Sequence, residues 1–445
     1  MILNVAARNL IQARVRTGML SLAIGMVTMA LILLMSLSAG INDNLVRGAT
    51  TMSGGMITVG GFYKQTPTSA APLVTHIDEV RKVVQENTPN LDYMIDRSRG
   101  WGKLISTTGS AQSGLSGIDV AEESHFFDVI TLAKESEYKV GGRDEAFGNP
   151  RDLAKPDTIM LFVSQAKRLD VTVGDLVTVQ IETMGGQTNT VDVTVVAVAK
   201  DLGLLSSFAV YLPKSTLREL YKVDDGVGGA VWVYLKEVDE SEATMKHLRE
   251  VFAAKGYRVM DHVESPFFMK FETVQGEDWT GQKIDLTIWR DEVAMLTWVI
   301  TAFDTVTGAL VAVLVVIIAV GIMNSMWNTV RERTREVGTM RAIGMQRGQV
   351  ALLFLAEAFL LGLFATSMGA LFGIALALGI DALHITIPVD AVKFVLLADT
   401  LHFKVRPLSV FFAISTLTTV TALSAVWPSI RAAGLRPVIA LGYAQ

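Results

Sequence analysis

The sequence contains no cysteine, which excludes a disulfide framework and any thiolate metal or redox site. It also lacks the G-x-x-x-x-G-K-[ST] motif, so the chain carries no phosphate-binding loop of its own. There is no run of basic residues and no acidic tail, so nucleic acid is not an expected partner. The six histidines show no ligand-type spacing with each other or with carboxylates. We therefore expect no metal site and no catalytic function in this chain.

Charge is also scarce, at 19% of residues, whereas soluble domains contain roughly 25%. The apolar excess is concentrated in four blocks, and a helix needs about 20 apolar residues to cross the hydrocarbon core. The blocks predict four transmembrane helices at residues 18–40, 305–327, 350–380 and 408–428. The first block could instead be a signal peptide, because Arg14 and Arg16 precede it. It exceeds the usual apolar length of about 7–15 residues, which favours a retained span.

The arginines predict the orientation of these spans. Three segments are rich in arginine: residues 1–17, 328–349 and 429–445. Together they hold ten arginines and only two acids; the arginines are Arg8, Arg14, Arg16, Arg331, Arg333, Arg335, Arg341, Arg347, Arg431 and Arg436. The positive-inside rule places these segments in the cytoplasm. We expect an inner-membrane protein with both termini cytoplasmic, a short extracytoplasmic loop at 381–407 and a large periplasmic domain at 41–304.

The large domain is soluble in character and mixes both kinds of secondary structure. Strands are predicted at Met56–Tyr63 and Val191–Val198, and helices at Thr75–Asn87 and Glu240–Lys255. Glycine, aspartate and short strands accumulate at about residues 112–221, which predicts a β-rich subdomain inserted into an α+β one. The fold class is therefore membrane α-helical, with four transmembrane helices and a large α+β extracytoplasmic domain between helices 1 and 2.

Three finer predictions concern the local structure of this domain. Val231–Leu235, the helix that follows it and Tyr257–Met260 suggest a strand–helix–strand unit. Asp43–Val46 and Leu286–Trp298 are expected to continue the first two spans as a stalk. Ser113–Gly117 contains glycines around serine, but it lacks the strand-to-helix context of a nucleophile elbow, so a turn is expected there.

Glu357 is an ionisable residue inside a predicted span, which by default suggests a functional role. A proton relay is one interpretation. Pairing with an arginine of the neighbouring loop is the favoured one, because Glu357 lies near the cytoplasmic end of its span and one carboxylate does not make a proton path.

The loop Val330–Met345 reads VRERTREVGTMRAIGM. Gly338 and Gly344 are predicted to punctuate the end of a helix and to bracket a short segment, Thr339–Ile343. Without further information, this would be an ordinary solvated loop of the positive-inside kind.

The loop resembles the signature of the FtsX/MacB-type permeases of ABC systems, which include the lipoprotein-releasing LolC and LolE subunits. That signature has the form E-R-[TK]-R-E-[IV]-G-x-x-[RK]-A-[IL]-G-[AM]. The matching residues are Glu332, Arg333, Thr334, Arg335, Glu336, Val337, Gly338, Arg341, Ala342, Ile343, Gly344 and Met345. Glu357-Ala358 in the next span, the opening Ala7-Arg8-Asn9-Leu10 and the closing run from Pro428 to Tyr443 are also similar to the family.

The resemblance implies a permease subunit without a fused ATPase domain. In this family the loop forms a coupling helix that docks in a groove of an ABC ATPase, here expected to be a separate chain that binds ATP and Mg. Thr339–Met345 would be the docking element, Arg331–Glu336 its arm, and Arg341 a bidentate ion-pairing residue on the ATPase. The glycines would permit a sharp redirection of the chain. No cofactor is expected in this chain.

The resemblance also implies partners and a mode of action. The family works by mechanotransmission, in which ATP-driven closure moves the spans as levers and so moves the outside domain. Expected partners are a second permease copy or a paralogue, membrane lipid, and a periplasmic adaptor or lipoprotein carrier. Substrates could be a lipoprotein, a peptide or a hydrophobic small molecule. The alternative is an FtsX-like regulatory module that signals the state of the ATPase to a cell-wall enzyme. An ion-coupled secondary transporter would need more spans and paired midplane charges.

Overall fold

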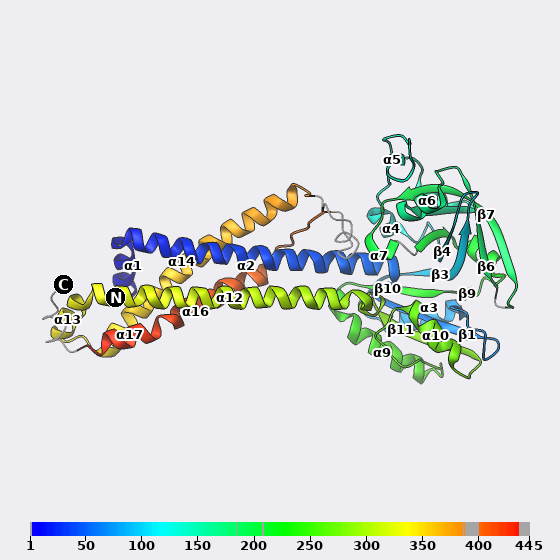
Figure 1. Ribbon diagram of the computed structural model, residues 1–445. Coiled ribbons are helices and arrows are strands. Elements are labelled where there is room, and N and C mark those ends of the chain that lie inside the picture. Colours follow the sequence, from blue (N-terminus) through cyan, green and yellow to red (C-terminus); the bar gives the residue numbers. More distant parts are fainter. Residues whose placement is uncertain (1, 184, 207–208, 386, 388–399, 436–445) are drawn as a thin grey trace. The chain divides into compact units, whose positions relative to one another are not determined.

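The computed structural model describes residues 2–183, 185–206, 209–385, 387 and 400–435 (Figure 1). The chain forms two compact units. The membrane unit comprises Met1–Asp43, Ile300–Thr386 and Thr400–Gln445, and the large domain comprises Asn44–Val299 with Ile387–Asp399. Within the described residues, four helical stretches are long and apolar enough to cross a membrane: Thr17–Ser53, Ala294–Glu332, Arg347–Ala382 and Pro407–Ala433.

Each predicted span lies within these stretches. Residues 18–40 fall in α2 (Arg14–Gly48), residues 305–327 in α12 (Ala294–Glu332) and residues 350–380 in α14 (Arg347–Ala382). Residues 408–428 run from α16 (Pro407–Ser424) into α17 (Val426–Ala433). The helix is interrupted at Ala425 because the ring of Pro428 clashes with the carbonyl four residues earlier and supplies no N–H. A separate helix, α1 (Ile2–Gln12), precedes α2.

Small residues allow the helices of the membrane unit to approach closely. A Cβ at Gly369 of α14 would lie 2.3 Å from the carbonyl oxygen of Gly25 in α2. On the same helix, a Cβ at Gly362 would lie 2.9 Å from Thr421 of α16. The Thr366 and Thr418 hydroxyls are 3.0 Å apart, so α14 and α16 also share a hydrogen bond. Such packing replaces the hydrophobic driving force that is missing between helices in lipid.

The large domain contains a sheet that is partly open and partly closed. The open part is antiparallel and has the order β11 (Gly281–Ile288), β1 (Ile57–Lys64), β10 (Ala230–Leu235) and the first half of β3 (Leu91–Ile105). Helices α3 (Ile77–Asn87) and α9 (Ser241–Ala254) pack on it. Their inward faces share one apolar core with the strands, which includes Val59, Val84, Val233, Leu248 and Phe252.

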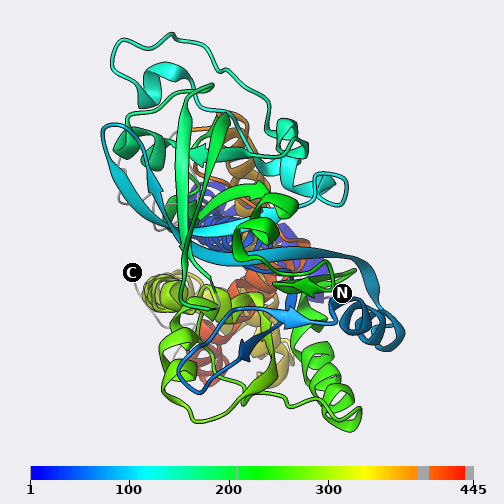
Figure 2. The same cartoon turned by 90° about the vertical axis from the view of Figure 1, so that its right-hand side faces the viewer.

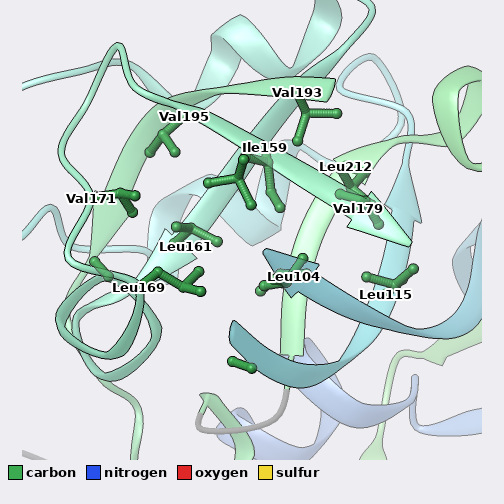
Figure 3. Packing of buried hydrophobic residues seen from close by; sticks show 14 of the residues in the cluster. Leu104, Leu115, Ile159, Leu161, Leu169, Val171, Val179, Val193, Val195 and Leu212 are labelled. Atoms are coloured by element: carbon green, nitrogen blue, oxygen red, sulfur yellow. The ribbon is translucent and has the colours of Figure 1, made fainter. Parts of the chain in front are cut away.

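The second half of β3 belongs to a closed barrel (Figure 2). From β3 the order is β4 (Ser110–Ile118), β8 (Ala209–Pro213), β5 (Thr158–Phe162), β7 (Thr188–Ala199) and β6 (Leu176–Glu182). The barrel closes because Lys103–Ile105 of β3 pair with Thr178–Gln180 of β6. The interior is filled by branched apolar side chains, among them Leu104, Ile159, Val179 and Val195 (Figure 3). Closure leaves these strands without an exposed edge.

Shorter elements make up the rest of the secondary structure in the described residues. β2 (Val74–Thr75) pairs with β9 (Val227–Gly228). The remaining helices are η1 (Ala49–Ser53), α4 (Ser124–Val129), α5 (Glu135–Tyr138), η2 (Pro150–Ala154), α6 (Val163–Leu169), α7 (Gly203–Ser206), α8 (Lys214–Tyr221), η3 (Val238–Glu240), α10 (Phe267–Gly276), α11 (Trp289–Glu292) and α13 (Thr334–Ala342).

The four predicted strands and helices of the large domain are confirmed as β1, β7, α3 and α9. Three finer predictions are wrong in whole or in part. Ser113–Gly117 is not a turn but lies inside β4, where a Cβ at Gly117 would be 3.1 Å from Leu217 of the overlying α8. The predicted stalk is only partly right. Asp43–Val46 continues the first span within α2, and Ala294–Trp298 belongs to α12, but Leu286–Ile288 is the end of β11, because its hydrogen bonds go to β1.

The third wrong prediction is the closing strand of the strand–helix–strand unit. Tyr257–Met260 forms only one bridge, between Val259 and Ile284. The barrel also differs from the predicted insert at its start, because residue 112 falls inside β4 whereas the barrel pairing begins at Ser98 in β3. One long strand serves both parts of the domain, so no boundary in composition marks the transition.

Candidate functional site

The loop between α12 and α14 folds as the short helix α13, Thr334–Ala342. α12 ends at Glu332, and Arg333 interrupts the helix with φ −102° and ψ 17°. The Thr334 hydroxyl donates to the Val330 carbonyl at 2.9 Å, which ties the two helices across the break. Arg331–Glu336 is therefore not one continuous arm, because the helix changes at Arg333.

Gly338 and Gly344 have different structural roles. Gly338 was predicted to end a helix, but it lies buried in the middle of α13, which packs against α14 and α17. Gly344 does end it, with φ +105°. Its N–H donates to Arg341 O at 3.2 Å, and the Met345 N–H donates to Met340 O at 3.0 Å. These two bonds form the Schellman motif, in which glycine takes the left-handed position after a helix.

The predicted docking residues divide between two faces of α13. Thr334 and Val337 are buried, and Val337 belongs to the apolar core of the membrane unit. The exposed residues follow helical spacing and are Arg335, Glu336, Thr339, Ala342 and Ile343. Ile343 is 82% exposed at the end of the helix. The structure therefore presents an outward face with an apolar tip, held from behind by buried contacts.

Arg341 is only half-buried, and its Nε has no hydrogen-bond partner among the described residues. Arg335 is the more accessible of the two arginines on α13. The predicted ion pair of Arg341 with an ATPase stays a prediction. Met345, next to the Schellman glycine, packs against the apolar core of the membrane unit.

Glu357 lies at the centre of a polar cluster that joins three elements. Its side chain is 6% exposed, and its two oxygens accept from Arg333 Nη1 at 2.8 and 3.0 Å. Asn9 of α1 donates to the same carboxylate at 2.6 Å. Arg333 Nε also donates to Glu336 at 2.7 Å. We call Asn9, Arg333, Glu336 and Glu357 the Glu357 cluster. The favoured interpretation of Glu357, pairing with a loop arginine, is confirmed.

The electrostatics keep Arg333 charged. Burial by itself lowers the pKa of Arg333, but the carboxylates of Glu357 and Glu336 more than offset it, so the pKa lies above the usual value. A buried carboxylate is stable only when it is paired and hydrogen-bonded, and Asn9 and Arg333 supply both requirements. The cluster therefore connects α1 and α13 to α14 through one charged group.

The sequence did not predict two contacts at this end of the membrane unit. Arg431 of α17 lies between two tryptophans, with its Cζ 5.9 Å from the Trp327 ring and 5.6 Å from the Trp427 ring. Asn9 was noted only as part of a motif, and nothing in the sequence links it to Glu357. Of the closing motif, Pro437, Ala440, Leu441 and Tyr443 lie outside the described residues. Within the described part of the chain, no group of His, Asp or Glu residues could hold a metal ion.

Comparison with known proteins identifies the family. The model of the MacB-like periplasmic core domain matches residues 17–251, which is more than half of the chain, and the model of the FtsX-like permease C-terminal region matches residues 308–437. The chain belongs to the MacB/FtsX family of ABC transporter permeases. α13 and Glu357 lie within the FtsX-like match, and the MacB-like match begins just before the first span. A MacB-like large domain does not favour the alternative of an FtsX-like regulatory module.

The relatives differ in how much of their length is shared. The ABC transporter permease YtrF of Bacillus subtilis (strain 168) is 26% identical over 411 residues, which cover 86% of this chain and 84% of YtrF. The macrolide export ATP-binding/permease protein MacB of Bartonella quintana (strain Toulouse) is 25% identical over 174 residues, 39% of this chain and 23% of MacB. The pyoverdine export protein PvdT of Pseudomonas aeruginosa is 44% identical over 71 residues, 16% of this chain and 10% of PvdT.

Two solved structures are similar to the large domain. The extracellular domain of the transporter YknZ from Gram-positive bacteria is 13% identical, with a TM-score of 0.29. The match covers 51% of this chain and 98% of the YknZ domain. The periplasmic region of MacB from Actinobacillus actinomycetemcomitans is 15% identical and covers 56% and 94%, also with a TM-score of 0.29. Scores this low do not by themselves establish a common fold, so the family membership rests on the two family models.

Proposed function

We propose that this chain is the non-catalytic membrane subunit of an ATP-driven complex, in which a separate ABC ATPase binds ATP and Mg and docks on α13. Hydrolysis in that subunit moves the large domain and thereby exports or extracts a substrate. The arginine distribution supports an inner-membrane orientation with both termini and α13 in the cytoplasm and the large domain in the periplasm. The chain acts as a dimer, with a second copy of itself or a paralogue.

The observation that carries this proposal is the two-sided construction of α13. Its inner face is buried and its outer face ends in Ile343, which is 82% exposed. A short helix with an apolar tip suits a groove on a partner, because burial of such a side chain contributes about 1.5–3 kcal/mol. The Glu357 cluster then passes a displacement of α13 to α14 and α1 through the ion pair of Arg333.

The substrate class is proposed from the relatives. Macrolide export and pyoverdine export are the activities named for MacB and PvdT, although this chain spans only 23% and 10% of their lengths. A hydrophobic small molecule is therefore the first substrate class to test. A lipoprotein or a peptide, delivered to a periplasmic adaptor or lipoprotein carrier, is the second.

Co-purification tests the docking surface directly. The full-length chain with Ile343→Asp should retain less than about a tenth of the ATPase subunit that the natural chain retains, because a charged side chain would be buried in an apolar groove. Val140→Asp is the matched control, since Val140 is a fully exposed apolar residue of the large domain. Equal retention of the ATPase by both variants would contradict docking through α13.

A further inference from the structure

The first membrane helix ends in an unusual way inside the large domain. After Gly48, α2 continues as the single π-helical turn η1, Ala49–Ser53, which is closed by the N–H of Gly54 donating to Ala49 O at 3.1 Å. The last carbonyls of a helix have no partner within the helix and must find one elsewhere. π-Helical turns are rare in proteins, and those that occur often lie at functional sites.

Here four successive carbonyls receive donors from side chains of three strands. Tyr234 of β10 donates to Thr50 O at 2.8 Å, and Arg97 Nη1 of β3 donates to Thr51 O at 2.9 Å. Two longer contacts follow, from the Tyr211 hydroxyl to Met52 O at 3.5 Å and from Arg99 Nη2 to Ser53 O at 3.4 Å. We call Arg97, Arg99, Tyr211 and Tyr234 the α2 clamp.

Arg97 is the most firmly held member of the α2 clamp. It is fully buried, and its guanidinium forms a two-pronged ion pair with Glu123, with Nη2 2.7 Å from Oε2. The Trp232 ring lies 4.0 Å from its Cζ. One guanidinium thus binds Glu123 with two nitrogens and the end of α2 with the third. A cation at the C-terminal end of a helix is also favourable to the helix dipole.

Apolar packing fastens the same turn. The Met52 side chain is 5% exposed and belongs to the cluster formed by Ile118, Phe126, Phe162 and Tyr211, so it inserts among residues of the barrel. Ala49 packs with Trp289 and Val293. The turn is therefore embedded in the large domain through its carbonyls and through its side chains.

We propose that the α2 clamp, through Arg97 and Tyr234, is the attachment by which motion of the first membrane helix is transmitted to the large domain. This role rests on the proposed function, because it needs an ATP-driven motion to transmit. Arg97 and Tyr234 are positioning residues. They act by holding the turn that ends α2 against β3 and β10.

The attachment itself is tested without any ATPase, in the full-length chain in lipid nanodiscs. Tyr234→Phe removes one hydroxyl and keeps the ring, so hydrogen exchange of residues 50–54 should become about 5-fold faster, as expected for the loss of one hydrogen bond. Tyr221→Phe is the matched control, because the hydroxyl of the half-buried Tyr221 also donates to a backbone carbonyl of β3, but to that of Trp101 and not to one of η1. Equal exchange in the two variants would overturn the attachment.

A stronger variant combines Arg97→Gln with Glu123→Gln, since removing Arg97 alone would leave a buried carboxylate unpaired. It should accelerate exchange of residues 50–54 by about 10-fold or more, because it removes a charge-assisted hydrogen bond. The transmission role is then tested in the complex with the ATPase. The natural chain has no cysteine, so spin labels at Leu22→Cys and Glu182→Cys are unique.

In the natural chain, a non-hydrolysable ATP analogue should shift the distance between the two labels. In Tyr234→Phe and in the double variant the shift should fall at least 2-fold, while the rate of ATP hydrolysis stays within 2-fold and Tyr221→Phe keeps the full shift. A full shift in variants whose η1 exchanges faster would overturn the transmission role alone. No shift in the natural chain would contradict the proposed function, and the transmission role with it.

Discussion

At the residue scale, the Glu357 cluster shows how a charge is kept inside the membrane unit. The pairing of Glu357 with a loop arginine was predictable, because Glu357 lies seven residues into its predicted span and arginines crowd the loop before it. The contribution of Asn9 was not predictable, since it contacts Glu357 across 348 positions of the sequence. Only the packing of α1 against α14 brings the two together.

Arg333→Gln should destabilise the membrane unit by about 3–5 kcal/mol, because it leaves the carboxylate of Glu357 buried and unpaired. The double variant Arg333→Met with Glu357→Met should recover most of that loss. Thermal unfolding of the full-length chain in detergent measures both. Arg347→Gln is the control, since Arg347 is exposed at the start of α14. An Arg333→Gln protein as stable as this control would show that the ion pair contributes little.

Glu292 of the large domain gives a prediction on pH. Burial raises the pKa of Glu292 and outweighs the attraction to Arg99, while Thr287 and the Phe267 N–H donate to its oxygens. Since the folded-state pKa lies above the unfolded one, Glu292 contributes stability below its ordinary pKa of about 4.3. That contribution is lost as pH rises through the folded-state pKa.

Glu292→Gln should therefore gain stability relative to the natural chain as the pH is raised from 4 to 8, because the amide cannot ionise. Melting temperatures of the full-length chain across this range measure the difference. Glu182→Gln, at an exposed position of β6, serves as the control and should follow the natural chain throughout. If the melting temperatures of Glu292→Gln and the natural chain change with pH in the same way, the raised pKa of Glu292 is contradicted.

At the element scale, elements that show in local apolar spacing were predictable, whereas the pairing of distant strands was not. The spans and the amphipathic helices α3 and α9 were predictable, because apolar spacing directly reflects burial. Ser113–Gly117 of β4 was predicted as a turn because glycine and serine favour turns. Small residues are needed there for another reason, which is the close packing of α8 on the strand. Barrel closure between β3 and β6 depends on contacts about 75 residues apart, which no local pattern encodes.

Gly344→Ala tests the ending of α13. Gly344 has φ +105° and nothing near its missing Cβ, so alanine meets no clash and only the backbone cost of about 1–2 kcal/mol. The Schellman turn should loosen, and binding of the ATPase should weaken several-fold. Gly348→Ala is the control, because Gly348 lies in open space inside α14 with an ordinary helical φ. Equal ATPase binding by both variants would show that the turn is not required for docking.

At the scale of the whole molecule, the two family models divide the chain into two parts. The large domain matches the MacB-like core, and the membrane helices from Gly308 onward match the FtsX-like permease. The proposed ATPase contact is α13, and the proposed attachment to the large domain is the α2 clamp. The sequence pointed to α13 through its charge and its family signature, but it contained no sign of the α2 clamp, whose donors come from three separated strands.

The most direct test of the central claim is ATP hydrolysis by the ATPase subunit reconstituted with this chain in lipid. Arg341→Glu should reduce hydrolysis to the rate of the ATPase alone, because it reverses a charge on the proposed docking helix, while the large domain stays folded. Arg347→Glu, an equal reversal just beyond α13, should leave the stimulated rate intact. Full stimulation of ATP hydrolysis by the Arg341→Glu chain would contradict the role of Arg341. A hydrolysis rate that does not change when the natural chain is added would contradict the coupling itself.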